Sequence, residues 1–469
     1  MNKITNHYFK DLFIRNKKIL MLYMFVCIMA FPFVLLMNKI LSGGSGFGTI
    51  IQVAFTFGTI LPILMGMILP VFAFKFTLNK RNVDTFYALP INRSHLFKSH
   101  FIAMILGAIV PILIAYLMGA VLLLTYYPFT TILTLFGYLL IMMGLFILLF
   151  SFNTFIVLKC NNVLDASIVI IMMSILPFVV YLAFMSFISS QVVPTGMINT
   201  PSANIILQLF SVIYSYVQLL SGIRINFEQI TFDLAVLDTW QYFYFALMTV
   251  FFIYMSYRTF KNKKGESAEQ LTTSLITYPF LINVGLLALI MTINLARTEF
   301  IYVIFTILCL FVVFVIAKGI ANRSLKVTGK MVLQFVLMIV LINGFNYVSK
   351  QTEFFGINRR IVTYEDQDEV IFHYYRYYFE SDEVDPYIEI DVKNISEPEQ
   401  KLLDIMEDLQ KEASRNFKNS YSSYYNQDIE GNLNIAYRKN HKETRNIHYP
   451  LSPEMNQKVN ALINQILEK

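Results

Sequence analysis

The sequence predicts an all-α polytopic membrane protein with about nine transmembrane helices and a small C-terminal α+β extracytoplasmic domain. Three observations lead to this fold class. Hydrophobic residues make up 56% of the 469 residues and charged residues only 14%. Apolar runs of about 20 residues recur, and each can cross a hydrocarbon core of roughly 30 Å as a helix. The last quarter of the chain is by contrast polar and acidic.

Nine apolar runs are long enough to be spans, at about 19–38, 51–74, 101–125, 131–157, 166–189, 239–257, 275–296, 300–317 and 331–348. The first run lacks a small-residue cleavage site, so we expect a span there rather than a signal peptide. The runs divide the chain into an amphipathic interfacial segment at 1–18, a six-span core at 19–257, a basic cytosolic linker at 258–274, three further spans at 275–348 and a polar domain at 349–469.

Positive charge predicts the orientation of the spans. If the N-terminus is cytosolic, the segments 1–18, 75–100, 158–165, 258–274 and 318–330 face the cytosol and together hold 19 Lys and Arg residues. The alternate segments hold three, which are Lys39, Arg224 and Arg297. This asymmetry satisfies the positive-inside rule. We therefore expect a multi-pass protein of the cell membrane with its C-terminal domain outside, and we expect no nucleic-acid binding.

One segment, 203–222, leaves two topologies open. It is apolar enough to be a tenth span, which would place the C-terminal domain in the cytosol. That topology would turn the basic residues 258–264 outward and Glu228, Asp233 and Asp238 inward. Because this inverts the positive-inside rule, we favour a re-entrant or interfacial hairpin in an external loop of about 190–238.

The first 18 residues combine basic and apolar side chains. The apolar residues recur at helical spacing, which predicts an amphipathic helix in the membrane interface before the first span. A solvated basic start is the simpler alternative. The residues that we assign to this elbow-like helix are Lys10, Phe13, Arg15, Lys17 and Lys18.

The polar C-terminal domain shows helix and strand signals. A capping box at 396–399 and the dipeptide Ser452-Pro453 each predict the start of a helix. Alternating apolar residues predict strands at 371–379 and 387–392, and a hairpin formed by 434–438 and 444–449. We expect a loop at 414–428, which is rich in Ser, Tyr and Asn.

The residues that carry chemistry are few. The glycine-rich stretch at 43–48 lacks a following Gly-Lys-Ser/Thr, so it predicts a turn rather than a phosphate-binding loop. The six histidines are scattered and fit no zinc pattern. The middles of the nine runs contain no ionisable residue, whereas ion-coupled carriers usually keep such groups near the midplane. We expect no enzymatic activity and no bound cofactor, and we expect the driving energy to come from another chain.

The basic segment 75–100 carries the most informative motif. It lies between the second and third runs and contains Asp84-Thr-Phe-Tyr-Ala-Leu-Pro-Ile-Asn-Arg93. This pattern, with the basic start and the six-span layout of residues 1–260, resembles the permease subunits of ABC-2-type ABC transporters. The positions that match the family's motif are Thr85, Leu89, Pro90, Ile91, Asn92 and Arg93. The three extra spans and the external domain resemble the enlarged permeases of low-GC Gram-positive bacteria.

The resemblance implies a function and partners. In that family the loop after the second span forms a coupling helix that docks on an ATPase, which binds ATP and Mg²⁺. This role would fall on Asp84, Thr85, Phe86, Tyr87, Leu89, Pro90, Ile91, Asn92 and Arg93, with Phe86, Tyr87 and Leu89 as apolar anchors. Two ATPase subunits, a second permease chain and membrane lipid are the implied partners. Export or extraction of an amphipathic compound, such as a peptide, an antibiotic or a lipid-like molecule, is the implied activity.

Alternatives remain for the loop and for the function. Residues 89–93 could simply start the third helix, since Pro suits a first helical turn. A membrane sensor or resistance component without transport would explain the external domain but not the basic loops. A secondary transporter would need an ionisable or ion-binding midplane, which the sequence lacks.

Overall fold

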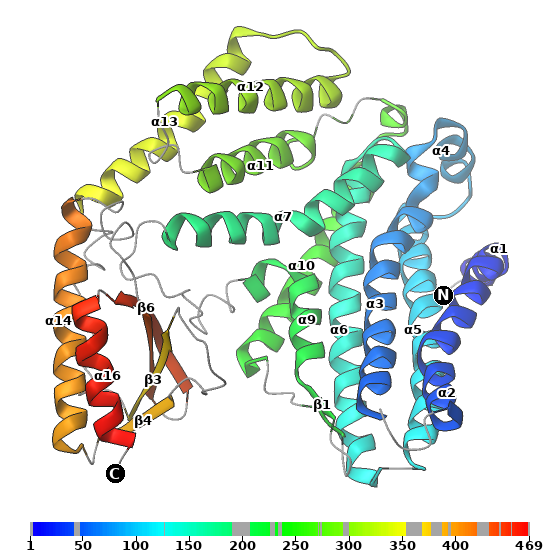
Figure 1. The fold of residues 1–469 in the computed structure, drawn as a ribbon. Coiled ribbons are helices and arrows are strands. Elements are labelled where there is room, and N and C mark those ends of the chain that lie inside the picture. Colours follow the sequence, from blue (N-terminus) through cyan, green and yellow to red (C-terminus); the bar gives the residue numbers. More distant parts are fainter. Residues whose placement is uncertain are drawn as a thin grey trace. The chain divides into compact units, whose positions relative to one another are not determined.

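The computed structural model describes most of the chain as helix (Figure 1). The chain folds into two compact units. The first is Met1–Phe178, Gln208–Val284 and Lys318–Ser324, and the second is Val179–Leu207, Gly285–Ala317 and Leu325–Lys469. The described residues are 3–41, 47–125, 127–189, 207–225, 230–232, 237–270, 272, 274–293, 300–352, 368–376, 387–392, 395–419, 431–439, 442–451 and 453–467.

The first span is continuous with the basic N-terminal segment. Helix α1 runs from Lys3–Ile28 without a break, and a π-helical turn η1, Met29–Phe33, leads into α2, Val34–Leu41. The predicted interfacial segment 1–18 is helical from Lys3 and joins the first span in one helix, and its place in the membrane interface remains a prediction. No Gly or Pro interrupts residues 8–28, so nothing breaks the helix there. The irregular turn comes instead at Pro32, which has no N–H to donate.

The remaining elements of the first unit form a helical bundle. In chain order they are α3 Phe47–Phe74, η2 Lys75–Leu78, α4 Lys80–Tyr87, α5 Arg93–Leu123, α6 Phe129–Lys159, α7 Val163–Ser189, α9 Val212–Ser221, β1 Ile223–Ile225, β2 Ile230–Phe232, α10 Thr239–Asn262, η4 Gly265–Ser267 and α11 Tyr278–Ile293. Only the first part of α7 and of α11 belongs to this unit. Helix α6 packs against α3 and α10, and α5 packs against α1 (Figure 1).

Several polar groups inside the bundle form hydrogen bonds between helices. Thr59 Oγ1 lies 2.6 Å from the hydroxyl of Tyr138, which joins α3 to α6. The hydroxyl of Tyr216 on α9 donates to the carbonyl of Met142 at 3.0 Å. Asn153 Nδ2 donates to the carbonyl of Gly66 at 3.0 Å. Such bonds hold helices together where lipid offers no alternative partner.

Seven described helices are long and apolar enough to cross a membrane. They include the α1–α2 segment, α3, α5, α6 and α7, with α12 Phe300–Asn322 and α13 Gly329–Gln351. The sequence predicts two more spans, at 239–257 and 275–296. Helix α10 is long enough, with 24 residues, but its composition is less apolar. Helix α11 has 16 described residues, and the end of the predicted span lies outside the described residues. The structure therefore shows a multi-pass membrane protein, and nine spans remain a prediction.

The ambiguous segment 203–222 contains a short helix. Helix α9 has 10 residues, which corresponds to about 15 Å, or roughly half of the hydrocarbon core. Strands β1 and β2 follow it and pair antiparallel. Residues 203–206 lie outside the described part of the chain. Residues 207–210 are also helical, and Ser211 separates them from α9, so no continuous described helix here is long enough to cross, and the hairpin remains a prediction.

The C-terminal part of the second unit is an α+β domain. Strands β3 Glu369–Arg376, β4 Tyr387–Asp391, β5 Gly431–Lys439 and β6 Lys442–Leu451 form an antiparallel sheet in the order β4-β3-β5-β6. Helices α14 Glu397–Asn419 and α16 Pro453–Leu467 pack together on the sheet (Figure 1). Apolar residues of strands and helices form one core, which includes Phe372, Ile390, Leu403, Ile435 and Val459.

The local signals of this domain are mostly confirmed. The backbone N–H of Ser396 donates to Glu399 Oε2 at 2.6 Å, which is one half of the predicted capping box. Helix α16 begins at Pro453 as predicted. The predicted loop at 414–428 starts later, because α14 continues to Asn419. The amphipathic pattern of α14 carries the helix beyond Ser414, and residues 420–428 lie outside the described part.

Candidate functional site

The segment between α3 and α5 folds into a short helix and a turn. Helix α4 begins after Asn79, whose carbonyl accepts from the N–H of Val83 at 3.0 Å. The N–H of Ala88 donates to the carbonyl of Asp84 at 3.1 Å and closes the last turn. Residue 89 precedes a proline and so is disfavoured in a helix. This explains why α4 ends where the motif continues.

Pro90 lies in the turn and does not start α5. Helix α5 begins at Arg93, with Asn92 at its N-cap position. The carbonyl of Asn92 accepts from the N–H groups of His95 and Leu96. The alternative that residues 89–93 simply start the third helix is therefore wrong for residues 89–92, and only Arg93 belongs to α5. The motif instead forms a turn with Ile91 N–H bonded to the carbonyl of Leu89 at 2.7 Å.

One face of α4 packs against the protein itself. Val83 is 2% exposed and approaches η4 so closely that a Cβ on Gly265 would lie 2.9 Å from its Cγ1. The ring of Phe86 lies 4.5 Å from that of Phe76 and 5.9 Å from that of His100. These contacts fix α4 on the ends of the bundle helices.

Arg93 and Tyr87 tie the loop to the end of α10. The guanidinium carbon of Arg93 lies 4.3 Å from the centroid of the Tyr87 ring. Its Nη1 donates to the carbonyls of Lys261 at 3.2 Å and Lys263 at 3.3 Å. The pKa of Tyr87 is raised because the side chain is partly buried, and the positive charge of Arg93 opposes this shift. The motif arginine therefore bonds within its own chain.

The opposite face of α4 and the turn are exposed. Lys80 and Arg93 are exposed at its two ends, and the exposed positions between them, which we call the α4 ridge, are Arg81, Asp84, Thr85, Ala88, Pro90 and Asn92. Leu89 and Ile91 are half-buried beside it. The structure thus brings eight of the nine predicted coupling residues into one helix and the turn after it, and the ninth, Arg93, begins α5 directly behind them. Of the three predicted apolar anchors, however, Phe86 and Tyr87 turn inward, so they hold the ridge in place rather than form it.

The predicted elbow residues lie on α1 near the same end of the bundle. Lys10, Lys17 and Lys18 are exposed, and Phe13 packs on Phe9 with ring centroids 5.2 Å apart. Arg15 lies 3.9 Å from Asp11 in an exposed ion pair, which contributes little stability. The guanidinium of Arg15 also lies 5.3 Å from the ring centroid of Phe86. The hydroxyl of Tyr8 lies 2.7 Å from His100 Nε2, so α1 contacts both α4 and α5.

A chain of hydrogen bonds that sequence patterns did not predict joins α7 to α4. The Thr272 hydroxyl donates to Asp165 Oδ2 at 2.8 Å and accepts from the N–H of Asn161 at 3.2 Å. The carbonyl of Asn161 accepts from the N–H of Glu269 at 2.7 Å. Glu269 Oε1 in turn accepts from the N–H of Lys80 at 3.3 Å. The only sequence feature that could have pointed to this chain of hydrogen bonds is Asp165, the one acidic residue of segment 158–165.

Lys263 is a buried basic residue, and the pattern of residues in the sequence does not reveal its burial. It is 8% exposed, and its Nζ donates to the carbonyl of Cys160 at 2.6 Å, which joins the ends of α10 and α6. Burial lowers the pKa of Lys263 from 10.5 to about 8, because it disfavours the charged form. Burial also raises the pKa of Cys160 from 9.0 to about 12.

These shifts predict a stability that rises with pH between 7 and 9. In this range the unfolded chain keeps a proton on Lys263 that the folded chain loses around pH 8, so the free energy of unfolding increases by about 1 kcal/mol. Cys160 acts in the opposite direction, because the unfolded thiol ionises before the folded one, and this partly offsets the rise as the pH approaches 9. Thermal unfolding of the protein in detergent, measured from pH 7 to 9, checks this. Lys263→Met is expected to remove the rise, and Lys264→Met, at an exposed neighbour, to keep it.

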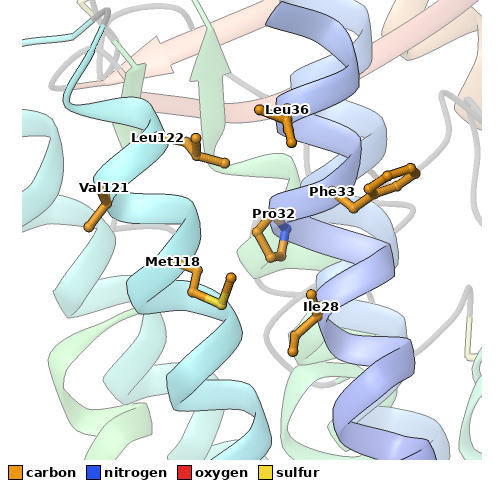
Figure 2. A pocket seen from close by; sticks show the side chains of 7 residues that line it. All are labelled: Ile28, Pro32, Phe33, Leu36, Met118, Val121 and Leu122. Carbon is orange, nitrogen blue, oxygen red and sulfur yellow. The ribbon is translucent and has the colours of Figure 1, made fainter.

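A second feature of the bundle is an apolar groove of about 400 Å³ at the turn around Pro32 (Figure 2). Figure 2 shows Met118 and Leu122 of α5 across the groove from Ile28 and Pro32. All seven lining side chains are apolar. Such a surface in a membrane-spanning pair of helices fits lipid tails, and it offers no group for catalysis.

No metal-binding site is present in the part of the chain that the structure describes. No three His, Cys, Asp or Glu side chains gather there in a way that could hold an ion. Comparison with known protein families, with curated proteins and with solved structures gives no match to this chain. The fold therefore gives the class of protein, which is a multi-pass α-helical membrane protein. Between two of its spans, α3 and α5, the short helix α4 packs on the bundle with one face exposed.

Proposed function

We propose that this chain is the transmembrane permease subunit of an ATP-driven ABC transporter, with ATP and Mg²⁺ bound by a separate ATPase. The observation that carries the proposal is the construction of α4. Its outer ridge is exposed, while its inner face contacts α1, α5 and α10 through Phe86 and Tyr87, and Arg93 at the start of α5 bonds to the end of α10. A helix mounted in this way can receive a contact and pass displacement to the bundle.

The α4 ridge is the proposed docking surface for the ATPase. Its small and polar side chains allow a partner to approach the backbone closely, and Leu89 adds apolar area at the edge. A push on the ridge would act through tilted and edge-to-face ring contacts and hydrogen bonds rather than through a flexible loop. Rigid-body movement of packed helices is a known way to turn such a displacement into a change of access.

The proposed assembly contains two permease chains and two ATPases, because each ATPase needs a docking site. The N-terminus would lie in the cytosol and the C-terminal α+β domain outside the cell membrane. Export or extraction of an amphipathic compound is favoured over uptake. The sequence supports this mode of energy supply, since the middles of the apolar runs carry no ionisable group for ion coupling.

The proposal predicts that an ATPase co-purifies with the chain and depends on the α4 ridge. The tagged protein is purified from membranes of its own organism, and ATP hydrolysis and proteins with a Gly-x-x-x-x-Gly-Lys-Ser/Thr loop are measured. Replacing both Thr85 and Ala88 by Arg places two bulky charges on the ridge. We expect this variant to lose co-purified ATP hydrolysis by about tenfold or more, as central interface residues do.

The control is Leu325→Arg, which changes a residue that is 73% exposed and lies in the predicted cytosolic segment 318–330. It is expected to keep the hydrolysis of the unmodified protein. Equal hydrolysis by the ridge variant would show that α4 is not the docking surface. Absence of any ATPase from the unmodified preparation would contradict the transporter assignment and favour a sensor.

A further inference from the structure

The first unit contains a second, more enclosed cavity of about 280 Å³ between α6, α7, α10 and the start of α9. Its walls are mainly apolar, with Phe152 from α6, Met173 from α7, and Met248 and Phe252 from α10. The cavity differs from the groove at Pro32 because polar groups also line it. Pockets that bind small ligands typically combine such apolar walls with a few placed polar groups.

A break in the helix at Ser211 supplies the polar end of this pocket. Residues 207–210 are helical, Ser211 is extended with φ −123° and ψ 103°, and α9 resumes at Val212. The Ser211 hydroxyl accepts from the N–H of Tyr214 at 3.3 Å. The hydroxyl of Tyr244, from α10, donates to the carbonyl of Leu209 at 3.3 Å. Non-helical backbone at membrane depth is tolerated where it is buried or lines a cavity, and transporters use such breaks as binding sites.

The break is held by a buried pair of amides. Gln241 Nε2 donates to Gln208 Oε1 at 2.7 Å, and the two side chains are 1% and 4% exposed. Ser215 Oγ donates to the carbonyl of Gln208 at 3.0 Å. Because these groups satisfy one another behind the pocket, the break has a defined shape before any ligand binds. Preorganisation of this kind lowers the entropic cost of binding.

Helix α7 adds a hydrogen-bond acceptor. Pro177 lines the pocket and has no N–H, so the carbonyl of Met173, four residues earlier, lacks its helical donor. Met173 lines the same pocket. A ligand hydroxyl or amide could donate to this carbonyl. None of the lining residues is charged, so a charged group would be poorly stabilised at this depth.

We infer that this pocket binds one single-chain amphiphile with a neutral hydrogen-bonding head group. The head would lie near Ser211 and Tyr244, and the alkyl chain would run along α10 toward Phe252. These two α10 positions, Tyr244 and Phe252, are eight residues apart, which corresponds to about 12 Å. Binding of the amphiphile needs no ATPase. Only its transport as a substrate would rest on the proposed function.

The test is photolabelling of the purified full-length chain in lipid nanodiscs. The probe is a dodecanol analogue with a diazirine near the end of its chain, and mass spectrometry locates the labelled residues. We expect labelling of α7 and α10 around Met173 and Phe252 that saturates and is displaced by unlabelled dodecanol. Met248→Trp fills the pocket and is expected to reduce this labelling by roughly tenfold.

The matched control is Leu247→Trp, which adds the same side chain at the adjacent position, 52% exposed on α10. It is expected to leave the labelling unchanged. Labelling that does not saturate, or that persists in a folded Met248→Trp protein, would overturn the binding site, because it would reflect bulk lipid exposure.

A second variant avoids any disturbance of packing. Tyr244→Phe keeps the ring and removes the hydroxyl, together with its bond to the carbonyl of Leu209, and is expected to weaken displacement by dodecanol roughly three- to tenfold, with displacement by dodecane unchanged. Equal weakening for both compounds, or none for either, would overturn the position of the head group. All of these measurements use the chain alone, so their failure is distinct from failure of the ATPase experiment.

Discussion

Replacing Gly119 by Ala is expected to destabilise the protein severely. A Cβ at this position of α5 would lie 2.3 Å from Cε1 and 2.7 Å from Cδ1 of Phe31. Phe31 is 1% exposed and stacks on Tyr116 at 4.3 Å, with Phe55 at 5.0 Å on another side. The ring therefore has no space to move into. Overpacking of this kind costs about 1–3 kcal/mol or more, because backbone must shift.

The measurement is the apparent melting temperature of the detergent-solubilised protein, followed by size-exclusion chromatography. Gly144→Ala is the matched control, since Gly144 also lies within a membrane-spanning helix but a Cβ there would have nothing within 4 Å. We expect that variant to melt at or slightly above the temperature of the unmodified protein, because Ala favours helix over Gly. Equal melting of the two variants would refute the close packing of η1 against α5.

Replacing Arg93 by Ala is expected to release α4 from the bundle without removing the ridge. The change deletes two hydrogen bonds to the carbonyls of Lys261 and Lys263 and the contact with the Tyr87 ring. Together these are worth on the order of 2 kcal/mol. Local opening of residues 80–92 should become correspondingly more frequent. We therefore expect amide hydrogen exchange in this segment to accelerate by about tenfold or more.

Arg93→Lys is expected to leave the amide groups of residues 80–92 as poorly protected from hydrogen exchange as Arg93→Ala does. A planar guanidinium can stack on Tyr87 while bonding two carbonyls, and an ammonium cannot reproduce this geometry. Lys98→Ala, at an exposed position of the same helix, is the control and should exchange like the unmodified protein. If exchange in 80–92 were unchanged in Arg93→Ala, α4 would be held mainly by Val83 and Phe86. In the proposed transporter, the Arg93→Ala protein should still bind ATPase but transmit its movement poorly.

Much of the fold follows from local patterns. The apolar runs predict α3, α5, α6 and α7 nearly in full, since a membrane core demands about 20 apolar residues in a row. In the C-terminal domain, Pro453 and the box at Ser396 predict helix starts because capping is a property of a few adjacent residues. The boundary at residue 18 remains a prediction, because an amphipathic helix and a span can be joined without any break, as they are in α1.

The candidate site divides in the same way. The sequence alone determined that residues 84–93 form a short element between two spans, because charge, Pro90 and flanking apolar runs are local signals. Only the tertiary structure decided that Phe86 and Tyr87 turn inward and that the ridge is made of small and polar residues. It also placed Lys263 on Cys160, 103 residues earlier in the chain. The physical reason is that an apolar or aromatic side chain near a membrane surface is equally satisfied by lipid, by a partner or by its own chain. Which of these covers the side chain depends on the packing of helices that are distant in the sequence, and local sequence patterns do not predict that packing.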